Sequence, residues 1–575
     1  MKVTIIDGYT DEPAGLGVPP YIDIYPRYIA GAVWHAEPSA DVRYFTVDYV
    51  RKNLEKVLKI ANLSDIVIFI AGIVVPGRYL GGEPIKADEI TRWPLLMERP
   101  LKLLVGPAAR FGFGLEGGKP AISPKKFENS FDLVVRGDPE IVIYDLLIEK
   151  SLEKVNPYKV RENYDLTSIF AVKGAKIVLQ HPNHGKNLIA ELETFRGCPR
   201  WVSGGCSFCI EPRYGKVVFR DPEDIAKEVE ALHMCGVRNF RLGRQSDILV
   251  YMSKETNDVE FPKPDPKALG KLLSMVRRAA PDLEVLHIDN VNPGTVAMHP
   301  DESKEAAKVI IRYHTSGDVA AMGLESADPD VVKANNLKVM PDDAIKAIEI
   351  INSVGSRRGS NGLPELLPGI NFIGGLEGES PRTYIRNKEF LNEVLAHGLL
   401  VRRINIRQVL PLPGTKMWDL GAKNIVKCKR EYERFKRWVR EVFDKEMLQR
   451  VVPRGVVLKG LYVEGWQEGY CLARQVGSYP LLTYLTERYE LWKKVDAVVV
   501  GYRSRSVIAV PYPLNPNTAS PRSLRMLPGS SKEIAKKIMV RRPFRSIKDL
   551  ESALQDVKGK HAVMRYLAVD DQYGS

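Results

Sequence analysis

Short runs of apolar residues alternate with longer mixed segments over the first 150 positions. The runs cover residues 3–6, 42–47, 66–74, 101–105 and 131–135. Continuous apolar runs are typical of parallel strands that are buried on both faces, and the segments between these runs are long enough to form helices. The pattern therefore predicts an α/β domain at residues 1–150, built on a doubly wound parallel sheet with helices on both faces.

A second alternation follows a connection that we expect over residues 150–190. Six strand candidates lie at residues 192–195, 239–242, 285–288, 319–323, 370–372 and 404–409. Six strand–helix units in about 220 residues favour a partial or complete β/α barrel over a second flat sheet, a choice that periodicity alone leaves open. We place this barrel at residues 185–425.

The pattern changes again after residue 425. A basic amphipathic helix is expected over residues 427–449, because apolar residues recur there at helical spacing. Three short strand candidates follow, at residues 456–461, 497–500 and 506–510. They predict a small β-rich domain, so that the helix and this domain fill residues 426–515. After a proline-rich breaker, residues 516–575 are expected to form short helices.

Composition excludes several classes of protein. Hydrophobic residues make up 44% of the 575 positions and charged residues 27%, so the chain is neither disordered nor collagen-like. Its most apolar run, residues 66–75, has about half the length that a membrane-spanning helix needs. We therefore expect a cytoplasmic protein without a membrane partner, whose oligomeric state the sequence does not indicate. The net charge of +13 permits a polyanionic partner without identifying one.

Three of the six cysteines lie within twelve residues. Cys198, Cys206 and Cys209 have the spacing C-x7-C-x2-C, directly after a predicted strand. Thiolates on such a glycine-containing loop can converge on one soft metal centre, either zinc or an iron–sulfur cluster. A three-thiolate iron–sulfur cluster leaves one iron open, whereas structural zinc needs a fourth protein ligand. Four residues could supply that ligand: His181, His184, His233 and Cys235.

The cysteine loop and its place after the first barrel strand resemble the radical S-adenosylmethionine (radical SAM) superfamily. In that superfamily three cysteines hold a 4Fe–4S cluster, and the open iron binds S-adenosylmethionine (SAM). The ending Cys206-Ser207-Phe208-Cys209 matches the usual C-x-aromatic-C, although the first interval has seven residues where three is commonest. The resemblance implies that Cys198, Cys206 and Cys209 bind the cluster and that Phe208 packs near adenine.

Later segments match the superfamily in the same order. Gly243 ends the second predicted strand, where a glycine motif meets the methionine amino group, but the acidic residue common there is absent. Glu325 and Ser326 end the fourth strand and resemble a ribose-binding segment, since an ionised carboxylate is a strong acceptor for hydroxyl donors. Gly374 and Gly375 resemble the fifth-strand segment that lets the backbone approach adenine.

The resemblance also implies a mechanism. An electron from a donor such as ferredoxin reduces the cluster, SAM is cleaved, and the resulting 5′-deoxyadenosyl radical abstracts hydrogen from an unreactive C–H bond. The protein binds and orients these groups and excludes water, while the cofactors perform the difficult chemistry. Catalytic residues outside the cluster are not identified by this resemblance.

The N-terminal sheet resembles the cobalamin-binding domain that precedes many radical SAM enzymes. Residues 132–140 are similar to the closing strand and turn of that domain. The histidine that ligates cobalt in many members is missing from residues 7–10. Two interpretations therefore stay open: the sheet binds cobalamin without that ligand, or it is a vestigial domain.

The C-terminal segment resembles a helix-hairpin-helix at residues 524–538, and residues 542–550 extend the match toward a second hairpin. Such hairpins direct backbone N–H groups at a phosphate. The resemblance implies nucleic-acid contacts from Gly529, Ser531, Lys532 and Lys536, although Ser531 stands where the second glycine is usual. Residues 516–565 hold twelve Lys and Arg against four Asp and Glu, a net charge of +8 that attracts nucleic acid of any sequence. A hairpin that packs only against protein is the alternative.

The order of these domains resembles an archaeal group of radical SAM proteins that carry a C-terminal helix-hairpin-helix. We predict a radical SAM enzyme that functionalises a C–H bond of a nucleic acid, with RNA favoured, by methylation or another modification. Two alternatives stay open. One is a radical SAM enzyme with a small-molecule or protein substrate, and the other is a non-catalytic nucleic-acid-binding protein with structural zinc.

Overall fold

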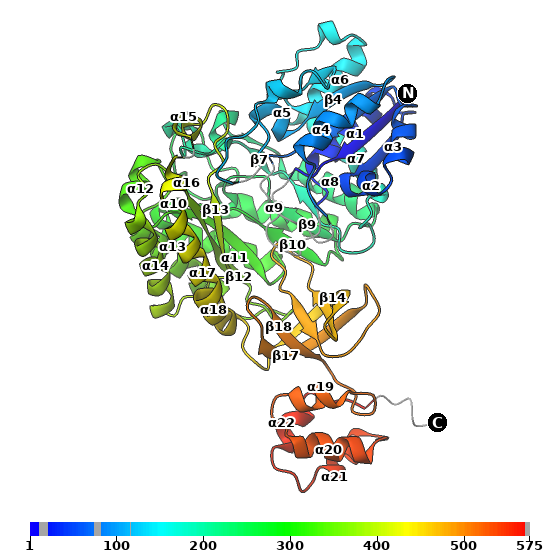
Figure 1. The fold of residues 1–575 in the computed structure, drawn as a ribbon, viewed down its shortest axis with the longest axis vertical. Helices are drawn as coiled ribbons and strands as arrows, with labels where there is room; N and C mark the ends of the chain where they lie inside the picture. The colour runs from blue at the N-terminus through cyan, green and yellow to red at the C-terminus, as the bar shows by residue number, and fades with distance from the viewer. Residues whose placement is uncertain (11–20, 74–81, 115–116, 422, 570–575) are drawn as a thin grey trace.

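The computed structural model describes residues 1–10, 21–73, 82–114, 117–421 and 423–569. Figure 1 shows an N-terminal α/β part, a β/α barrel, a small β-barrel and a helical part that lies at the opposite end of the molecule from the N-terminus. This mixed α/β architecture with parallel sheets confirms the predicted fold class, while the domain limits given above stay predictions. Within the described ranges, none of the helices is long and apolar enough to span a membrane.

The N-terminal part is a five-stranded parallel sheet in the order β2-β1-β3-β4-β5. The order reverses between β1 and β3, so a topological switch point lies at the carboxyl ends of these two strands. The third strand ends at Ile70, and residue 74 of its predicted span lies outside the described residues. The strands are β1 (Lys2–Asp7), β2 (Asp41–Thr46), β3 (Ile66–Ile70), β4 (Leu101–Val105) and β5 (Leu133–Val134).

Helices cover both faces of this sheet, as predicted. Buried residues of α2 to α5 pack on one face, and those of α1 and α6 pack on the other, which faces the barrel. The helices are α1 (Ile24–Ala36), α2 (Val47–Lys52), α3 (Leu54–Ala61), α4 (Ala87–Arg92), α5 (Pro107–Phe111) and α6 (Pro139–Glu149).

The segment predicted as a connection contains a helix, α7 (Asp165–Gly174), which packs on α1. The two helices cross at glycines: a Cβ on Gly31 would lie 1.8 Å from the carbonyl oxygen of Phe170, and one on Gly174 would lie 1.8 Å from that of Arg27. The buried face of α7 carries polar residues such as Thr167, so its apolar periodicity is too weak to predict a helix.

The central part is a partial β/α barrel, as predicted, and not a second flat sheet. Its six parallel strands follow chain order in two three-stranded sheets, β6-β9-β10 and β11-β12-β13. Val291 N–H donates to Ala321 O over 3.0 Å, which joins the two sheets at β10 and β11. The strands are β6 (Ala190–Leu192), β9 (Asn239–Leu242), β10 (Val285–Ile288), β11 (Asp318–Glu325), β12 (Leu366–Gly374) and β13 (Arg403–Gln408).

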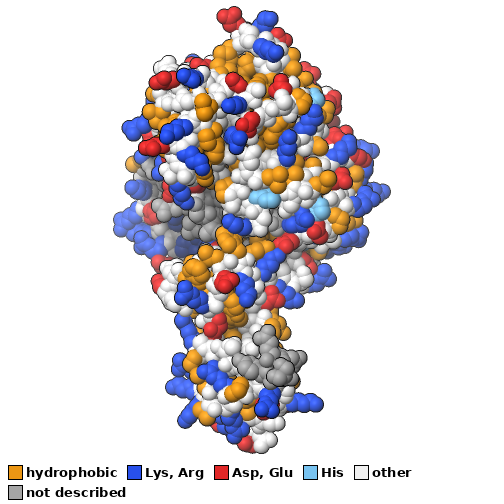
Figure 2. Space-filling view, turned by 90° about the vertical axis from the view of Figure 1, so that its right-hand side faces the viewer, with side chains coloured by type: hydrophobic (Ala, Val, Ile, Leu, Met, Phe, Trp, Pro, Cys, Tyr) orange, Lys and Arg blue, Asp and Glu red, His pale blue; other side chains and the backbone are white. Residues whose placement is uncertain are grey.

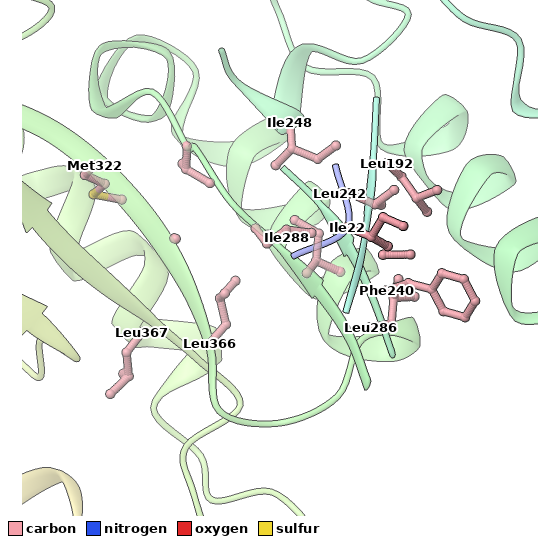
Figure 3. Close-up of a cluster of buried hydrophobic side chains, with 14 of the residues drawn as sticks. Ile22, Leu192, Phe240, Leu242, Ile248, Leu286, Ile288, Met322, Leu366 and Leu367 are labelled. Carbon is pink, nitrogen blue, oxygen red and sulfur yellow. The ribbon is translucent and has the colours of Figure 1, made fainter. Parts of the chain in front are cut away.

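Helices cover the outside of this barrel, and one continuous core joins it to the N-terminal part. Ile22 N–H donates to Ile189 O over 3.0 Å, so the segment before α1 runs beside β6. Figure 3 shows Ile22 among the buried side chains of the barrel strands, next to Leu192. The helices are α8 (Pro222–Met234), α9 (Pro266–Ala279), α10 (Pro293–Met298), α11 (Pro300–Tyr313), α12 (Pro329–Ala334), α13 (Pro341–Gly355) and α14 (Pro381–Ala396).

The strand predicted at residues 192–195 is interrupted. It consists of β6, which ends at Leu192, and of β7 (Phe195–Arg196), which pairs antiparallel with β8 (Val218–Phe219). Glu193 lies in the gap, and its buried carboxylate forms an ion pair with Arg161 over 2.5 Å. This polar pairing turns the chain out of the barrel sheet, and the β7–β8 pair then brackets the cysteine loop.

The predicted basic helix is present in several pieces, and a closed five-stranded β-barrel follows it. A π-helical turn, η8 (Val439–Phe443), interrupts the helix. The sequence predicted three of the barrel strands but not β15 and β16. The helices are α15 (Lys416–Leu420), α16 (Lys423–Lys427), α17 (Lys429–Trp438) and α18 (Asp444–Val451). The strands are β14 (Val457–Gln467), β15 (Tyr470–Arg474), β16 (Thr483–Leu485), β17 (Lys494–Tyr502) and β18 (Val507–Pro511).

The loop between β15 and β16 inserts into the β/α barrel from the amino ends of its strands. Ser478 N–H donates to His287 Nδ1 over 3.1 Å, and the Tyr479 hydroxyl donates to Asp289 Oδ1 over 3.0 Å. The guanidinium of Arg403, at the start of β13, lies 3.9 Å from the centre of the Tyr479 ring. The small barrel therefore closes this end of the larger one.

The last part is a bundle of four short helices with its own hydrophobic core. This core extends onto the β-barrel only through Val498, Val510 and a few neighbours. The chain end returns to the β-barrel exit, where Leu514 N–H donates to Tyr566 O over 2.8 Å. The helices are α19 (Pro521–Met526), α20 (Lys532–Arg541), α21 (Ile547–Ala553) and α22 (Lys560–Met564).

Candidate active site at the carboxyl ends of the barrel strands

The cysteine loop folds back on itself between β7 and β8. A short helical turn, η5 (Pro199–Ser203), begins directly after Cys198 and ends at Gly204. Gly205 has φ +67°, and a Cβ there would lie 2.2 Å from Pro212 Cγ, so only glycine fits. Cys209 N–H then donates to Cys206 O over 3.1 Å. This tight turn brings the last two cysteines of the motif together.

The thiols of the three predicted cluster cysteines lie close enough to affect one another electrostatically. Cys198 and Cys206 are buried and Cys209 is partly buried. Burial raises the pKa of all three thiols, that of Cys198 to about 11. The nearby thiols of Cys206 and Cys198 raise the pKa of Cys209 further. Buried thiols with such mutual repulsion need positive charge to ionise, which a metal cluster supplies when it binds.

Two basic side chains, which the sequence did not single out, already favour the thiolates. Arg200 donates from Nη1 to Cys206 Sγ over 3.0 Å. Lys338 lies near the end of β11 and, like Arg200, acts against the raised pKa of Cys206. Burial lowers the pKa of Lys338, but Glu325 and the three cysteines together raise it above its usual value. The loop is therefore an electropositive pocket for anionic sulfur.

Two adjacent asparagines hold this loop against the fourth and fifth strands. The Ser207 hydroxyl donates to Asn335 Oδ1 over 2.7 Å, and Asn335 Nδ2 donates to Glu377 O over 2.9 Å. Asn336 donates from Nδ2 to Gly205 O over 2.9 Å. The Asn-Asn pair directly after α12 is the sequence signal that could have identified them, because polar amides at a helix end favour backbone contacts.

Glu325 and Ser326 lie at the end of β11, as predicted. Glu325 has φ +67° and is buried, and burial raises its pKa to about 7 against the opposing effect of Lys338. Its Oε2 atom is buried without a hydrogen-bond partner. Ser326 Oγ accepts from Asp328 N–H over 3.2 Å, which leaves its own O–H as a donor. An unfilled buried acceptor beside the cysteine loop fits a ligand hydroxyl.

Phe208 packs in a small apolar cluster that joins the cysteine loop to the ends of β12 and β13. The predicted glycines lie around it, but protein atoms occupy the space beside each one. A Cβ would lie 1.9 Å from Glu191 Oε1 at Gly243, 2.7 Å from Tyr432 Cδ2 at Gly374 and 2.2 Å from Ile425 Cγ1 at Gly375. Packing explains these glycines, and their approach to a ligand stays a prediction.

The alternative of structural zinc finds no support in the geometry. One ring nitrogen of each candidate histidine has another partner: His181 Nδ1 accepts from Asn183 N–H, His184 Nε2 contacts Cys235 O, and His233 Nε2 pairs with Asp282. In the described part of the chain, no three His, Cys, Asp or Glu side chains come together closely enough for a single metal ion. In a 4Fe–4S cluster each thiolate binds a different iron, so the three thiols need not converge on a single ion.

The predicted nucleic-acid residues lie far from these groups, in the helical part at the other end of the molecule (Figure 1). Gly529, Ser531, Lys532 and Lys536 are all exposed, in the α19–α20 turn and on the first turns of α20. The structure therefore brings together the cysteines, Phe208, Glu325 and Ser326, and keeps the hairpin residues apart from them.

A family model described as the radical SAM superfamily matches residues 192–384, the stretch from β6 to α14. The chain belongs to the radical SAM superfamily. As a radical SAM enzyme, it uses a 4Fe–4S cluster and SAM. The buried, unfilled acceptor of Glu325, the three thiols and the two cations, Arg200 and Lys338, fit these groups.

Relatives match nearly the whole chain. An uncharacterized protein of Methanocaldococcus jannaschii is 45% identical over 88% of this chain and 92% of its own. An uncharacterized protein of Archaeoglobus fulgidus is 43% identical over 99% of both chains. This radical SAM protein therefore belongs to one family with these archaeal proteins.

Similarity to solved structures is low. The cobalamin-dependent SAM radical enzyme OxsB is 12% identical, with a TM-score of 0.46 over 75% of this chain. This chain spans 56% of the length of that enzyme.

Proposed function

We propose that this radical SAM enzyme functionalises a C–H bond of a nucleic acid, with RNA favoured, by methylation or another modification. When bound, the cluster and SAM supply a radical that takes hydrogen from an unactivated C–H bond. Cys198, Cys206 and Cys209 would hold the cluster, and Arg200 with Lys338 would offset the negative charge of their thiolates.

The remaining site residues would bind and orient SAM. Glu325 Oε2 would accept a ribose hydroxyl, and the Ser326 hydroxyl would donate beside it. Phe208 would pack against adenine within its apolar cluster, and the strand-end backbone at Gly243, Gly374 and Gly375 would lie closest to the ligand. Burial of these groups excludes water from the site.

The observation that carries the choice of substrate is the pair of hairpins at the C-terminus. The α19–α20 turn contains Gly529 with φ +80°, and the α21–α22 turn contains Gly559 with φ +82°. A Cβ on Gly529 would lie 2.6 Å from Ala562 Cβ on α22, and one on Gly559 would lie 3.5 Å from Gly529 O. The two hairpins thus pack turn against turn. The sequence resemblance did not identify Gly559 as the second turn.

The exposed surface of this pair suits a polyanion. Figure 2 shows Lys and Arg side chains projecting around the lowest lobe of the molecule, which the four short helices form. The Ser531 hydroxyl accepts from Ile534 N–H over 3.1 Å and so caps its own helix. The Ser531 hydroxyl is therefore engaged within the helix. The other backbone N–H groups at the start of α20, next to Lys532, would bind the phosphate. These features support a nucleic acid over the small-molecule or protein substrate.

The N-terminal sheet leaves open whether the enzyme also binds cobalamin. At its switch point the Asp7 carboxylate accepts from the Tyr44 hydroxyl over 2.7 Å and from Tyr9 N–H over 2.9 Å, and the first histidine of the chain is His35, near the end of α1. The segment after β1, where many members carry the cobalt ligand, therefore offers no imidazole, and any cobalamin would bind without that ligand. Corrinoid extracted from the purified protein would support that cofactor, and a cobalt-free extract would support the vestigial domain.

The test is a comparison of modified nucleosides in total RNA from cells with and without the gene, by liquid chromatography and mass spectrometry. We expect one modified nucleoside to be absent without the gene. The gene for wild-type protein should restore it, the Cys206→Ala variant should not, and a Cys471→Ala variant should serve as the matched control. Unchanged RNA together with active SAM cleavage by the purified enzyme, reduced by ferredoxin or dithionite, would contradict the nucleic-acid substrate.

A further inference from the structure

A cavity of about 240 Å³ lies at the opposite end of the β/α barrel from the cysteine loop. The start of β13, helix α18 and two segments of the small β-barrel enclose it. Its lining is unusual in charge, because four arginines face it: Arg402, Arg403, Arg474 and Arg505. Within the described residues, Asp444 pairs with Arg505 and Glu464 pairs with Arg474.

Among the described residues, carboxylates do not fully balance Arg402 and Arg505. Asp444 is shared between Arg440, at 2.6 Å, and Arg505, at 3.5 Å. Glu464 pairs with Arg474. In the described part of the chain, Arg402 pairs with no carboxylate and donates to the backbone carbonyl of Tyr479 over 2.7 Å. The cavity therefore carries a net positive charge in a partly desolvated place, where an unpaired charge is costly.

Buried guanidinium nitrogens of the cavity lining lack an acceptor among the residues that the structure describes. The Nε atoms of Arg402 and Arg474 are both buried without a hydrogen-bond partner. Burial and the neighbouring guanidinium groups of Arg403 and Arg505 lower the pKa of Arg402 to about 10. Unfilled donors and mutual repulsion are the features that an anion would relieve, because guanidinium groups bind phosphate oxygens with paired N–H donors.

We propose that this cavity binds a phosphate group, held mainly by Arg402 and Arg505. The volume lies below the roughly 300–1,000 Å³ typical of pockets for drug-sized ligands, so it suits one phosphate with little attached to it. A free phosphate or the terminal phosphate of a nucleic acid supplies the same chemistry. The side chain of Arg505 is 49% exposed, which places one arginine where an incoming anion first meets the cavity.

The position of the cavity gives the bound phosphate a structural role. Tyr479 and Arg403 also line it, and Tyr479 is the residue that reaches from the small barrel to Asp289 inside the large one. A phosphate bridging Arg402, on the β/α barrel, and Arg505, on the small barrel, would join the two parts through charge. This role is independent of the substrate of the radical reaction.

Calorimetric titration of inorganic phosphate into the full-length protein tests the proposal. We expect one site per chain, an affinity at least tenfold weaker in Arg505→Gln, and no detectable binding in the Arg402→Gln/Arg505→Gln variant. The matched control is Arg454→Gln, which removes an exposed arginine outside the cavity and should bind as the wild type does. Equal phosphate affinity in the wild type and the double variant, or no binding to the wild type, would overturn the proposal.

A second measurement separates the two sources and guards against a variant that fails to fold. Phosphate should raise the Tm of the wild type and of Arg454→Gln but not that of Arg505→Gln, whose exposed side chain makes misfolding a minor risk. A short RNA with a 5′-phosphate should compete with inorganic phosphate more strongly than the same RNA with a 5′-hydroxyl if the site binds nucleic-acid ends. Equal competition by the two RNAs would assign the site to a free phosphate compound.

Discussion

The two ends of the β/α barrel carry opposite chemistry on one set of strands. At the carboxyl ends, three thiols and Glu325 face two cations, Arg200 and Lys338. At the amino ends, four arginines face a cavity with two carboxylates nearby. β13 has six residues at about 3.3 Å each, so roughly 20 Å separates its ends and no small ligand spans both. Parallel strands thus let one domain hold a thiol site with two cations at one end and an arginine-lined cavity at the other, too far apart for their charges to cancel.

The largest expected effect comes from removing a thiol at the carboxyl end. Cys206→Ala should reduce the iron bound after anaerobic reconstitution from about four atoms per chain to near zero, and should abolish reductive SAM cleavage, because the cluster loses a ligand. Iron analysis and detection of 5′-deoxyadenosine measure both. Cys471→Ala, in the small β-barrel, is the control and should keep both; iron retained in Cys206→Ala would refute the ligand assignment.

A smaller effect at the same end is expected from the buried acceptor. Glu325→Gln keeps the size of the side chain but removes a charge, and a hydrogen bond to a charged group contributes about 1.5–3 kcal/mol. SAM affinity, measured by equilibrium dialysis on the reconstituted enzyme, should fall between roughly tenfold and a hundredfold. Phosphate binding at the amino end should not change. The exposed Glu468→Gln serves as the control, and wild-type SAM affinity in Glu325→Gln would remove this residue from the site.

Removing the two hairpin lysines should weaken RNA binding several-fold. We do not expect this effect from the arginine cavity. In Lys532→Gln/Lys536→Gln the slope of log affinity against log salt should shrink by about 1.4 for single-stranded RNA, since each lost phosphate contact contributes about 0.7. Fluorescence anisotropy at several salt concentrations measures it. The control is Lys125→Gln/Lys126→Gln, which removes the same charge from exposed positions elsewhere. An equal loss of RNA affinity in this control would show that overall charge, and not the hairpins, binds the RNA.

The smallest effect concerns Tyr479, the residue that reaches from the small β-barrel into the β/α barrel. Tyr479→Phe loses the hydrogen bond to Asp289 but keeps the ring on Arg403, so the free energy of unfolding should fall by about 1 kcal/mol. Urea denaturation of the full chain measures it, with Tyr158→Phe, an exposed tyrosine, as the control. A Tyr479→Phe protein as stable as the wild type would show that the inserted loop is held by packing alone.

The sequence predicted best what local pattern determines. The strands β9 and β10 have the predicted bounds, because each is a short apolar run between clear helices. β6 and β7 were merged, because the ion pair of Glu193 with Arg161 that separates them depends on a residue 32 positions away. The strands β15 and β16 are short and partly polar, which hides their alternation.

The candidate site divides in the same way. The three cysteines were predicted because they lie on one loop, and Phe208 and Glu325 because the segments around them resemble motifs of the radical SAM superfamily. Lys338, Asn335 and Asn336 follow α12 and reach the loop only through the barrel topology, so their roles need three-dimensional contacts. The arginine cavity is the extreme case: its lining joins residues from position 401 to position 506 that no motif connects.

The hairpin bundle shares a patch of its core with the small β-barrel, and this has a consequence for how the protein tolerates cutting. Val498 and Val510 of the β-barrel are buried against the bundle, and Leu514 pairs with the returning chain end. Cleavage after Asn515 would uncover this apolar patch and free a strand edge, both of which promote self-association. A shortened chain would therefore aggregate, and its loss of binding would not reveal what the bundle binds. Point substitutions on the outer surface of the bundle avoid this problem.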